Sequence, residues 1–423
     1  MSVEATNNRI KITLGIFIFR VILDFLYSKF VATIFGYTGF KITASTGRYV
    51  MSWLVLLIFV PIVIRIHKKT TISSIAMMLL VYWSVVPFTT MIAFYPYELV
   101  FIFQNTIYWL ILFTLYNLIP KINLVRIKND SLVNFFIKLV ILSFFVSILY
   151  ISWRFTGFRI TIDLSNVYNL RSEVINFRMP TILSYIYSAS KAVNPVLVVY
   201  YLSNKKYSIA GFILFIQLLS FSINGSKTVL FSTLLAVILY WFYNEKYKNR
   251  APWMFVVLGV LGAIEVYLNK TYLIIAFFIR RVFFVPNLLN YYYYDFFTAN
   301  TPDYLRQSFL RHFGLRSPYS AIDNLIGLIY FNKPEMGANS GLISDAYANF
   351  GILGLVIMPF VIVFALKIID ACSEGLDIRI FVVSGVTLAF IFVSSFFFTI
   401  LVTHGFLVLC LILYFLPRNN KYF

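Results

Sequence analysis

The stretch YVMSWLVLLIFVPIVIRI occupies residues 49–66 and is apolar almost throughout. The residues that follow it, His67, Lys68 and Lys69, are basic. An α-helix crosses the bilayer core with about 20 mostly apolar residues. Short loops rich in Lys and Arg face the cytoplasm. This stretch therefore predicts a membrane-spanning helix that ends at the cytoplasmic surface.

The whole chain has the composition of a membrane protein. Of its 423 residues, 61% are hydrophobic and 12% are charged, whereas a soluble domain has about a quarter charged residues. So apolar a chain could not cover a soluble core with polar surface, which argues against soluble enzymes and nucleic-acid binders. We expect no nucleic-acid partner. Its two cysteines, Cys372 and Cys410, provide neither a disulfide framework nor a metal cluster.

The same apolar pattern recurs along the chain. We expect one all-α integral membrane domain over residues 1–423, a polytopic protein with about 12 transmembrane helices. The predicted spans are 13–35, 49–66, 72–94, 98–119, 132–152, 181–203, 208–223, 228–243, 252–269, 342–369, 380–399 and 401–417.

The loops between these spans differ in charge. Alternate short loops are basic, which places both termini in the cytoplasm. The opposite loops include short turns, one of them near residue 400, and two long segments, 153–180 and 270–341. These two are expected to be outward-facing loops with short interfacial helices. They carry eleven cations, of which nine are Arg.

Arginine on the outward side suggests an anionic ligand. Its guanidinium group binds phosphate and carboxylate through two hydrogen bonds and stays charged in any environment. The excess therefore indicates a phosphate or diphosphate at the outer membrane surface. The alternative is that these arginines pair with loop carboxylates and with membrane lipids.

Several residues of the long loops are candidates for such a site. Arg280 and Arg281 lie between an apolar stretch and the run Tyr291–Tyr294, which predicts an amphipathic helix in the membrane interface. Arg171, Glu173 and Arg178 precede the span at 181–203. Glu173 between two arginines is either a positioned base or part of a salt-bridge clamp.

Four further residues are candidates for binding or proton transfer. Lys227 follows Asn224 and Gly225 in a turn between two short spans, which suits an anion at a helix start. His312 stands next to Arg311 and could accept a proton. Asp345 opens the span at 342–369 and could serve as a base, as an arginine partner or as a helix-dipole partner.

The tract Asp345-Ala346-Tyr347-Ala348-Asn349-Phe350-Gly351, the Arg280–Arg281 segment and the two Arg-rich outer loops resemble bacterial O-antigen and capsule repeat-unit polymerases of the Wzy type. Members of that family often have Glu where this chain has Asp345. The resemblance implies a GT-C-like glycosyltransferase of the bacterial inner membrane that needs no metal and no nucleotide cofactor. It would join repeat units carried on undecaprenyl diphosphate at the periplasmic face, transferring the growing glycan to the non-reducing end of a new unit. A chain-length regulator protein is a further candidate partner.

The resemblance gives the candidate residues roles. The diphosphate would be bound first by Arg171, Arg178, Arg280 and Arg281, and in addition by Arg311 and Lys227. The base would be His312, Glu173 or Asp345.

Two other functions stay open from the sequence. A flippase for lipid-linked oligosaccharides also needs cations, but it should place them inside the spans. Within the spans, Arg20 and Asp24 are spaced i, i+4 and are expected to neutralise each other. An O-antigen ligase would differ mainly in its acceptor, which the sequence does not identify.

Overall fold

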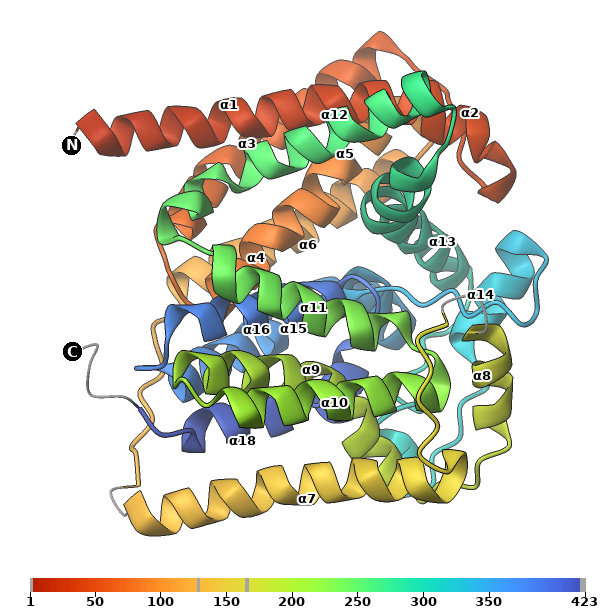
Figure 1. The fold of residues 1–423 in the computed structure, drawn as a ribbon. Coiled ribbons are helices and arrows are strands. Elements are labelled where there is room, and N and C mark those ends of the chain that lie inside the picture. The colour runs from red at the N-terminus through yellow and green to blue at the C-terminus, as the bar shows by residue number, and fades with distance from the viewer. Residues whose placement is uncertain (1–2, 128–129, 164–166, 419–423) are drawn as a thin grey trace.

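The computed structural model describes residues 3–127, 130–163 and 167–418, and every regular element in them is helical (Figure 1). Within these residues, nine helices are long and apolar enough to cross a membrane. They are Thr46–His67, Ile72–Phe94, Leu99–Leu118, Ser131–Thr156, Thr181–Ser203, Tyr207–Asn224, Lys248–Asn269, Leu342–Ser373 and Phe397–Phe415. The predicted all-α class is confirmed for this part of the chain, and the nine helices fit a polytopic membrane protein.

The first half of the chain consists of α1 (Val3–Leu26), η1 (Tyr27–Val31), α2 (Ala32–Ile34), η2 (Gly36–Thr38), α3 (Thr46–His67), α4 (Ile72–Leu80), η3 (Val81–Val85), α5 (Val86–Phe94), α6 (Leu99–Leu118), α7 (Asp130–Thr156), α8 (Val167–Ile175), α9 (Thr181–Ser203) and α10 (Tyr207–Asn224). The second half consists of α11 (Lys227–Phe242), η4 (Glu245–Arg250), α12 (Ala251–Asn269), η5 (Ile275–Phe284), α13 (Val285–Ala299), η6 (Leu310–Phe313), α14 (Ile322–Phe331), α15 (Leu342–Ser373), α16 (Ile378–Phe392), α17 (Phe397–Val402) and α18 (Phe406–Phe415).

The other three predicted spans are also helical, but they fall outside the nine. The span at 13–35 lies in the run α1–η1–α2, and the span at 228–243 is α11. The span at 380–399 was predicted too long, because α16 ends at Phe392 and a new helix begins at Phe397. The turn expected near residue 400 therefore lies at 393–396. The total of 12 spans stays a prediction.

The helices define two opposite faces of the molecule. Helix α1 begins and helix α18 ends on the same side of the molecule, at the left of Figure 1, and we call this side the terminal face. The short elements α2, α8 and α14 lie on the opposite side, which we call the loop face (Figure 1). The two long segments predicted to lie outside, 153–180 and 270–341, contribute these last two elements.

The core is built around the continuous helix α4–η3–α5. This helix contains no charged residue, and its apolar window is buried throughout. A helix that is apolar on all sides is either a core helix or a lipid-facing span, and here the protein itself buries it. It packs chiefly against α16 and α3. The buried cation of α1, Arg20, forms the predicted ion pair with Asp24 and also donates to Ser52 and Thr89.

The amphipathic segment after α12 is helical, as predicted. η5 continues directly into α13, and this long helix crosses the direction of α1 and α12 at the loop face (Figure 1). Its start packs closely on Gly262 of α12 through Ile274 and Ile275. The Asn287 amide reaches into the core and donates to the backbone oxygen of Ser84 at 3.1 Å. One side of the helix is therefore anchored in the protein interior.

Candidate functional site

Arg280 is a half-buried cation that forms no ion pair with any described carboxylate. Its guanidinium carbon lies 4.6 Å from the centroid of the Phe35 ring, a cation–π contact at the end of α2. Its Nε is buried and has no hydrogen-bond partner among the described residues. Burial lowers the pKa of Arg280, and the charge of Arg281 lowers it further, while Tyr37 opposes these effects. Both arginines thus present positive charge that the described part of the chain does not neutralise.

An apolar groove lies between α1 and α12, which run side by side (Figure 1). Its volume is about 500 Å³, and it is lined by Ile22, Phe25, Gly259, Val260, Ala263, Ile264, Tyr267 and Leu268. Tyr267 at its loop-face end contacts Phe30, with ring centroids 5.9 Å apart. Five residues further along the same helical run, Phe35 carries the Arg280 contact. The groove therefore leads towards the segment that holds Arg280 and Arg281.

Glu173 forms an ion pair, and its partner is Arg159. The contact has two hydrogen bonds, at 2.8 and 3.3 Å, and Arg159 also donates to the backbone oxygen of Ser222 at 3.3 Å. The Arg159 guanidinium lowers the pKa of the Glu173 carboxyl. The clamp was predicted with Arg171 or Arg178, whereas among the described side chains Glu173 pairs with Arg159, which precedes α8. Arg178 is exposed, and the side chain of Arg171 lies outside the described part of the structure.

Asp345 is completely buried and joins separate helices. One carboxylate oxygen accepts from the backbone N–H of Phe397, the first residue of α17, at 2.7 Å. The other accepts from the Asn349 amide at 2.5 Å. The first N–H groups of a helix have no partner within it, so a carboxylate there stabilises the helix start. This bond explains why a new helix begins at Phe397.

The long outer loop is attached to α15 close to Asp345, beside a break in that helix. Gly351 has φ 58° and ψ −139°, a backbone conformation that is available essentially to glycine alone. The carbonyl groups of Ala348 and Asn349 accept from the N–H groups of Asp303 and Tyr304, at 2.7 and 3.1 Å. The Asn349 side chain also accepts from the N–H of residue 305 at 2.8 Å. The tract at 345–351 therefore holds the loop in position.

The remaining predicted candidates lie apart from these contacts. Lys227 is exposed at the first position of α11, and the turn before it is closed by the Asn224 side chain, which accepts from the N–H of Ser226. Arg311 is exposed in η6. The side chain of His312 lies outside the described residues. Neither cation is shown to contact the Arg280 segment.

A cluster of tyrosines and carboxylates on the loop face was missed from the sequence. Glu98 accepts from the Tyr294 hydroxyl at 2.8 Å, and Asp295 accepts from the Tyr330 hydroxyl at 2.5 Å. Tyr291 lies within electrostatic range of both carboxylates; burial raises its pKa to about 12, and the two acids add to this shift. The tyrosine run was visible in the sequence, but its acidic partner Glu98 lies almost 200 residues away.

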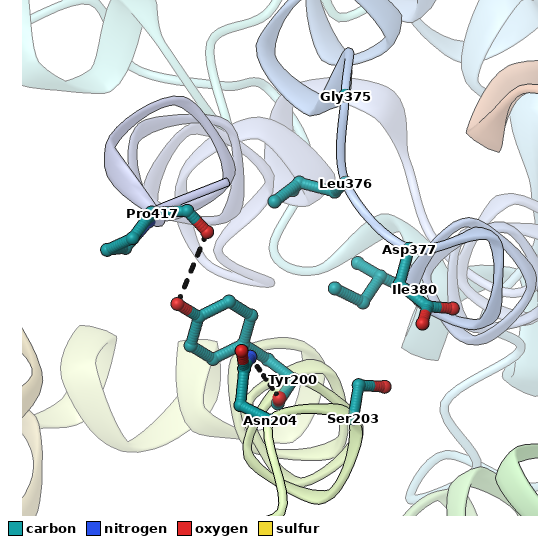
Figure 2. A pocket seen from close by; sticks show the side chains of 8 residues that line it. All are labelled: Tyr200, Ser203, Asn204, Gly375, Leu376, Asp377, Ile380 and Pro417. Atoms are coloured by element: carbon teal, nitrogen blue, oxygen red, sulfur yellow. Dashed lines mark hydrogen bonds between the residues drawn. The ribbon is translucent and has the colours of Figure 1, made fainter. Parts of the chain in front are cut away.

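A small crevice at the terminal face is shown in Figure 2. The Tyr200 hydroxyl donates to the backbone oxygen of Pro417 at 3.3 Å across it. The volume of the crevice is about 20 Å³, which is room for roughly one water molecule. It is lined by Tyr200, Ser203, Asn204, Gly375, Leu376, Asp377, Ile380 and Pro417. It cannot hold a lipid or a glycan.

In the described ranges, no three His, Cys, Asp or Glu side chains gather closely enough to hold a metal ion. Comparison with known proteins returns no family model, no curated protein and no solved structure that matches the chain.

Proposed function

We propose that this protein is a membrane glycosyltransferase that polymerises glycan repeat units carried on undecaprenyl diphosphate. In this proposal the loop face is periplasmic, the terminal face is cytoplasmic, and the membrane is the bacterial inner membrane. The observation that carries the proposal is the half-buried Arg280 guanidinium, which forms no ion pair among the described residues and contacts Phe35, just beyond the helical run whose first helix lines an apolar groove. Lipid diphosphates combine the two chemistries that these features would bind.

The contacts of the outer-loop arginines argue against the alternative that these cations serve only to pair with acidic residues. Among the described residues, the one ion pair of an outer-loop arginine is that of Arg159 with Glu173. Arg306 donates to backbone carbonyl groups within its own loop. Arg178, Arg281 and Arg311 are exposed. Positive charge at the loop face is therefore available to an anionic ligand.

In this proposal the groove and the arginines bind different parts of the lipid diphosphate. The polyprenyl chain lies in the apolar groove between α1 and α12, where burying each methylene group contributes about 0.8 kcal/mol. The diphosphate meets Arg280 and Arg281 at the end of the groove. The glycan extends along α13 towards Tyr291, Glu98 and Asp295. An aromatic ring flanked by carboxylates offers an apolar face and hydrogen-bond acceptors to a sugar.

The proposed reaction exchanges one bond at the anomeric carbon of the growing glycan. The oxygen of the acceptor hydroxyl forms a bond to this carbon, and the bond from the carbon to the diphosphate oxygen breaks. The diphosphate keeps the electron pair, and the hydroxyl proton passes to a base. Arg280 and Arg281 stabilise the negative charge that develops on the leaving group, an interaction whose loss typically costs about 10²–10³-fold in rate.

Of the candidate bases whose side chains the structure describes, Glu173 is accessible to a substrate hydroxyl and Asp345 is not. Both oxygens of Asp345 accept hydrogen bonds inside the protein, and its side chain is inaccessible. Glu173 is on the loop face, its side chain is 46% exposed, and Arg159 keeps it ionised. A Glu173→Gln variant should fold normally and lose about 10²-fold or more of the transfer rate. An unchanged rate would remove Glu173 from the reaction.

The function is tested in cells that make lipid-linked repeat units and lack their own polymerase. The wild-type chain should produce long glycans, and Arg280→Ala should leave single units that have already reached the outer side. Arg316→Ala, which removes an exposed arginine from the same loop, is the matched control and should keep the long products. Single units that stay inside the cell would instead identify a flippase, and wild-type chain lengths in the Arg280→Ala strain would exclude the proposed site.

A further inference from the structure

Two lysines lie over one tyrosine ring near the terminal face, away from the proposed active site, and a third lysine lies close enough to interact with both. The ammonium nitrogens of Lys69 and Lys367 lie 4.7 and 4.6 Å from the centroid of the Tyr116 ring. Lys69 belongs to the loop between α3 and α4, and Lys367 belongs to α15. Lys121, just after α6, lies within electrostatic range of both. Three positive charges thus converge from three separate parts of the chain.

One carboxylate, that of Asp370, lies within electrostatic range of Lys69 and Lys367. Its oxygens are already engaged, because the backbone N–H of Ser73 donates to one at 2.9 Å and the Ser73 hydroxyl donates to the other. Among the described residues, none of the three lysines has a carboxylate within ion-pair distance. The cluster therefore keeps a net positive charge.

The preference for basic residues on the cytoplasmic side accounts for the positions of these lysines, because it applies to loops and to the ends of spans. It does not account for the burial of Lys367. This lysine lies near the end of the spanning helix α15, yet it is only 5% exposed. Burying a charge is costly unless it is paired. An ammonium group has three N–H donors, and the acceptor that the structure gives Lys367 is the backbone oxygen of Tyr116, at 3.0 Å.

Lys69 connects the buried charge to the surface. It is half-buried and donates to the Asn117 side chain at 3.2 Å, which leaves further N–H groups for a ligand. Burial lowers the pKa of Lys69, and the charge of Lys121 lowers it further, while Asp370 raises it. An anion that reached the cluster past the exposed Lys121 would relieve this repulsion and complete the hydrogen bonds.

We propose that Lys69, Lys121 and Lys367 bind a phosphate group at the terminal face. The phosphate belongs either to the headgroup of an anionic phospholipid in the adjacent leaflet or to a free phosphorylated compound. Basic pockets between transmembrane helices on the cytoplasmic side are known to hold anionic lipid headgroups. The site is distinct from the Arg280 segment, so it stands or falls independently of the proposed function.

The test uses the full-length purified protein and two probes. In the first arm, phosphatidylglycerol is titrated into phosphatidylcholine nanodiscs that contain the protein, and binding is followed by the rise in the thermal unfolding temperature. In the second arm, inorganic phosphate is titrated into the same protein in pure phosphatidylcholine. A response to the lipid alone assigns the site to a headgroup, and a response to inorganic phosphate assigns it to a soluble compound.

Variants decide whether the cluster is responsible. Each lysine near a membrane surface contributes about 1 kcal/mol to the binding of anionic lipid, so Lys69→Ala should weaken binding about fivefold. The double variant with Lys367→Met should weaken it about 25-fold. Lys205→Ala, an exposed lysine of another terminal-face loop, should change nothing. If Lys69→Ala and Lys205→Ala respond alike to both probes, the proposal is wrong, and this comparison does not depend on the folding of the Lys367 variant.

Discussion

Replacing Arg280 by methionine separates the charge of this side chain from its packing. Methionine keeps an unbranched apolar stem against the Phe35 ring, where the guanidinium carbon now lies 4.6 Å from the ring centroid. It removes the positive charge and the buried Nε, which has no hydrogen-bond partner among the described residues. The variant therefore removes what a diphosphate would bind and leaves most of the local packing in place.

The expected loss of binding follows from the contacts that one guanidinium can make. A hydrogen bond to a charged group contributes about 1.5–3 kcal/mol, and each 1.36 kcal/mol is a factor of ten in affinity. Arg280→Met should therefore weaken binding of undecaprenyl diphosphate by about 10- to 100-fold. Stability should change little, because losing a cation–π contact of about 0.5–1 kcal/mol is offset by no longer burying part of a charged group.

The assay measures binding of undecaprenyl diphosphate and of undecaprenol to the purified protein in nanodiscs. Undecaprenol has the same chain and no diphosphate, so its affinity should be the same for wild type and Arg280→Met. Arg316→Met is the control for a general change in surface charge. Equal weakening by both arginine variants, or equal loss of undecaprenol binding, would refute the assignment of Arg280 to the diphosphate.

Three further predictions concern the groove, the loop anchor and the outer ion pair. Ala263→Trp fills the groove and should weaken binding of undecaprenyl diphosphate and undecaprenol alike, by about tenfold or more in the same assay. Asn349→Ala removes the side-chain amide that accepts from the N–H of residue 305 and donates to Asp345, and it should destabilise the protein by about 1–3 kcal/mol, measured by thermal unfolding. Arg159 lowers the pKa of Glu173, so the stabilisation from this pair is present at neutral pH and is lost as the pH falls through the lowered pKa. Proteolysis of the surrounding loop should then accelerate in acid, and Glu173→Gln should remove this pH dependence.

Hydropathy was sufficient to predict most of the helices, because a membrane span needs a long apolar run whatever surrounds it. Hydropathy did not predict the end of α16. Residues 393–396 are Val, Ser, Ser and Phe, and two serines are too few to interrupt the apolar pattern. The boundary depends on the bond from the Phe397 N–H to Asp345, a residue 52 positions away. Such a contact has no local signature in the sequence.

The candidate site was predictable in its charges and not in its pairings. The sequence indicated Arg280 and Arg281, because cations were unexpected on that side of the membrane. It did not show that Glu173 pairs with Arg159, or that Glu98 meets Tyr294. These partners come together only when the chain folds. In each case other side chains of the same type lie close in the sequence, so the sequence alone does not show which of them forms the contact.

The most direct measurement is a structure of the protein bound to undecaprenyl diphosphate in a lipid nanodisc. The diphosphate oxygens should lie about 2.7–2.9 Å from guanidinium nitrogens of Arg280 or Arg281, with the polyprenyl chain in the groove between α1 and α12. A diphosphate bound at another part of the surface, with both arginines left in contact with water and lipid alone, would contradict the proposed site and the function built on it.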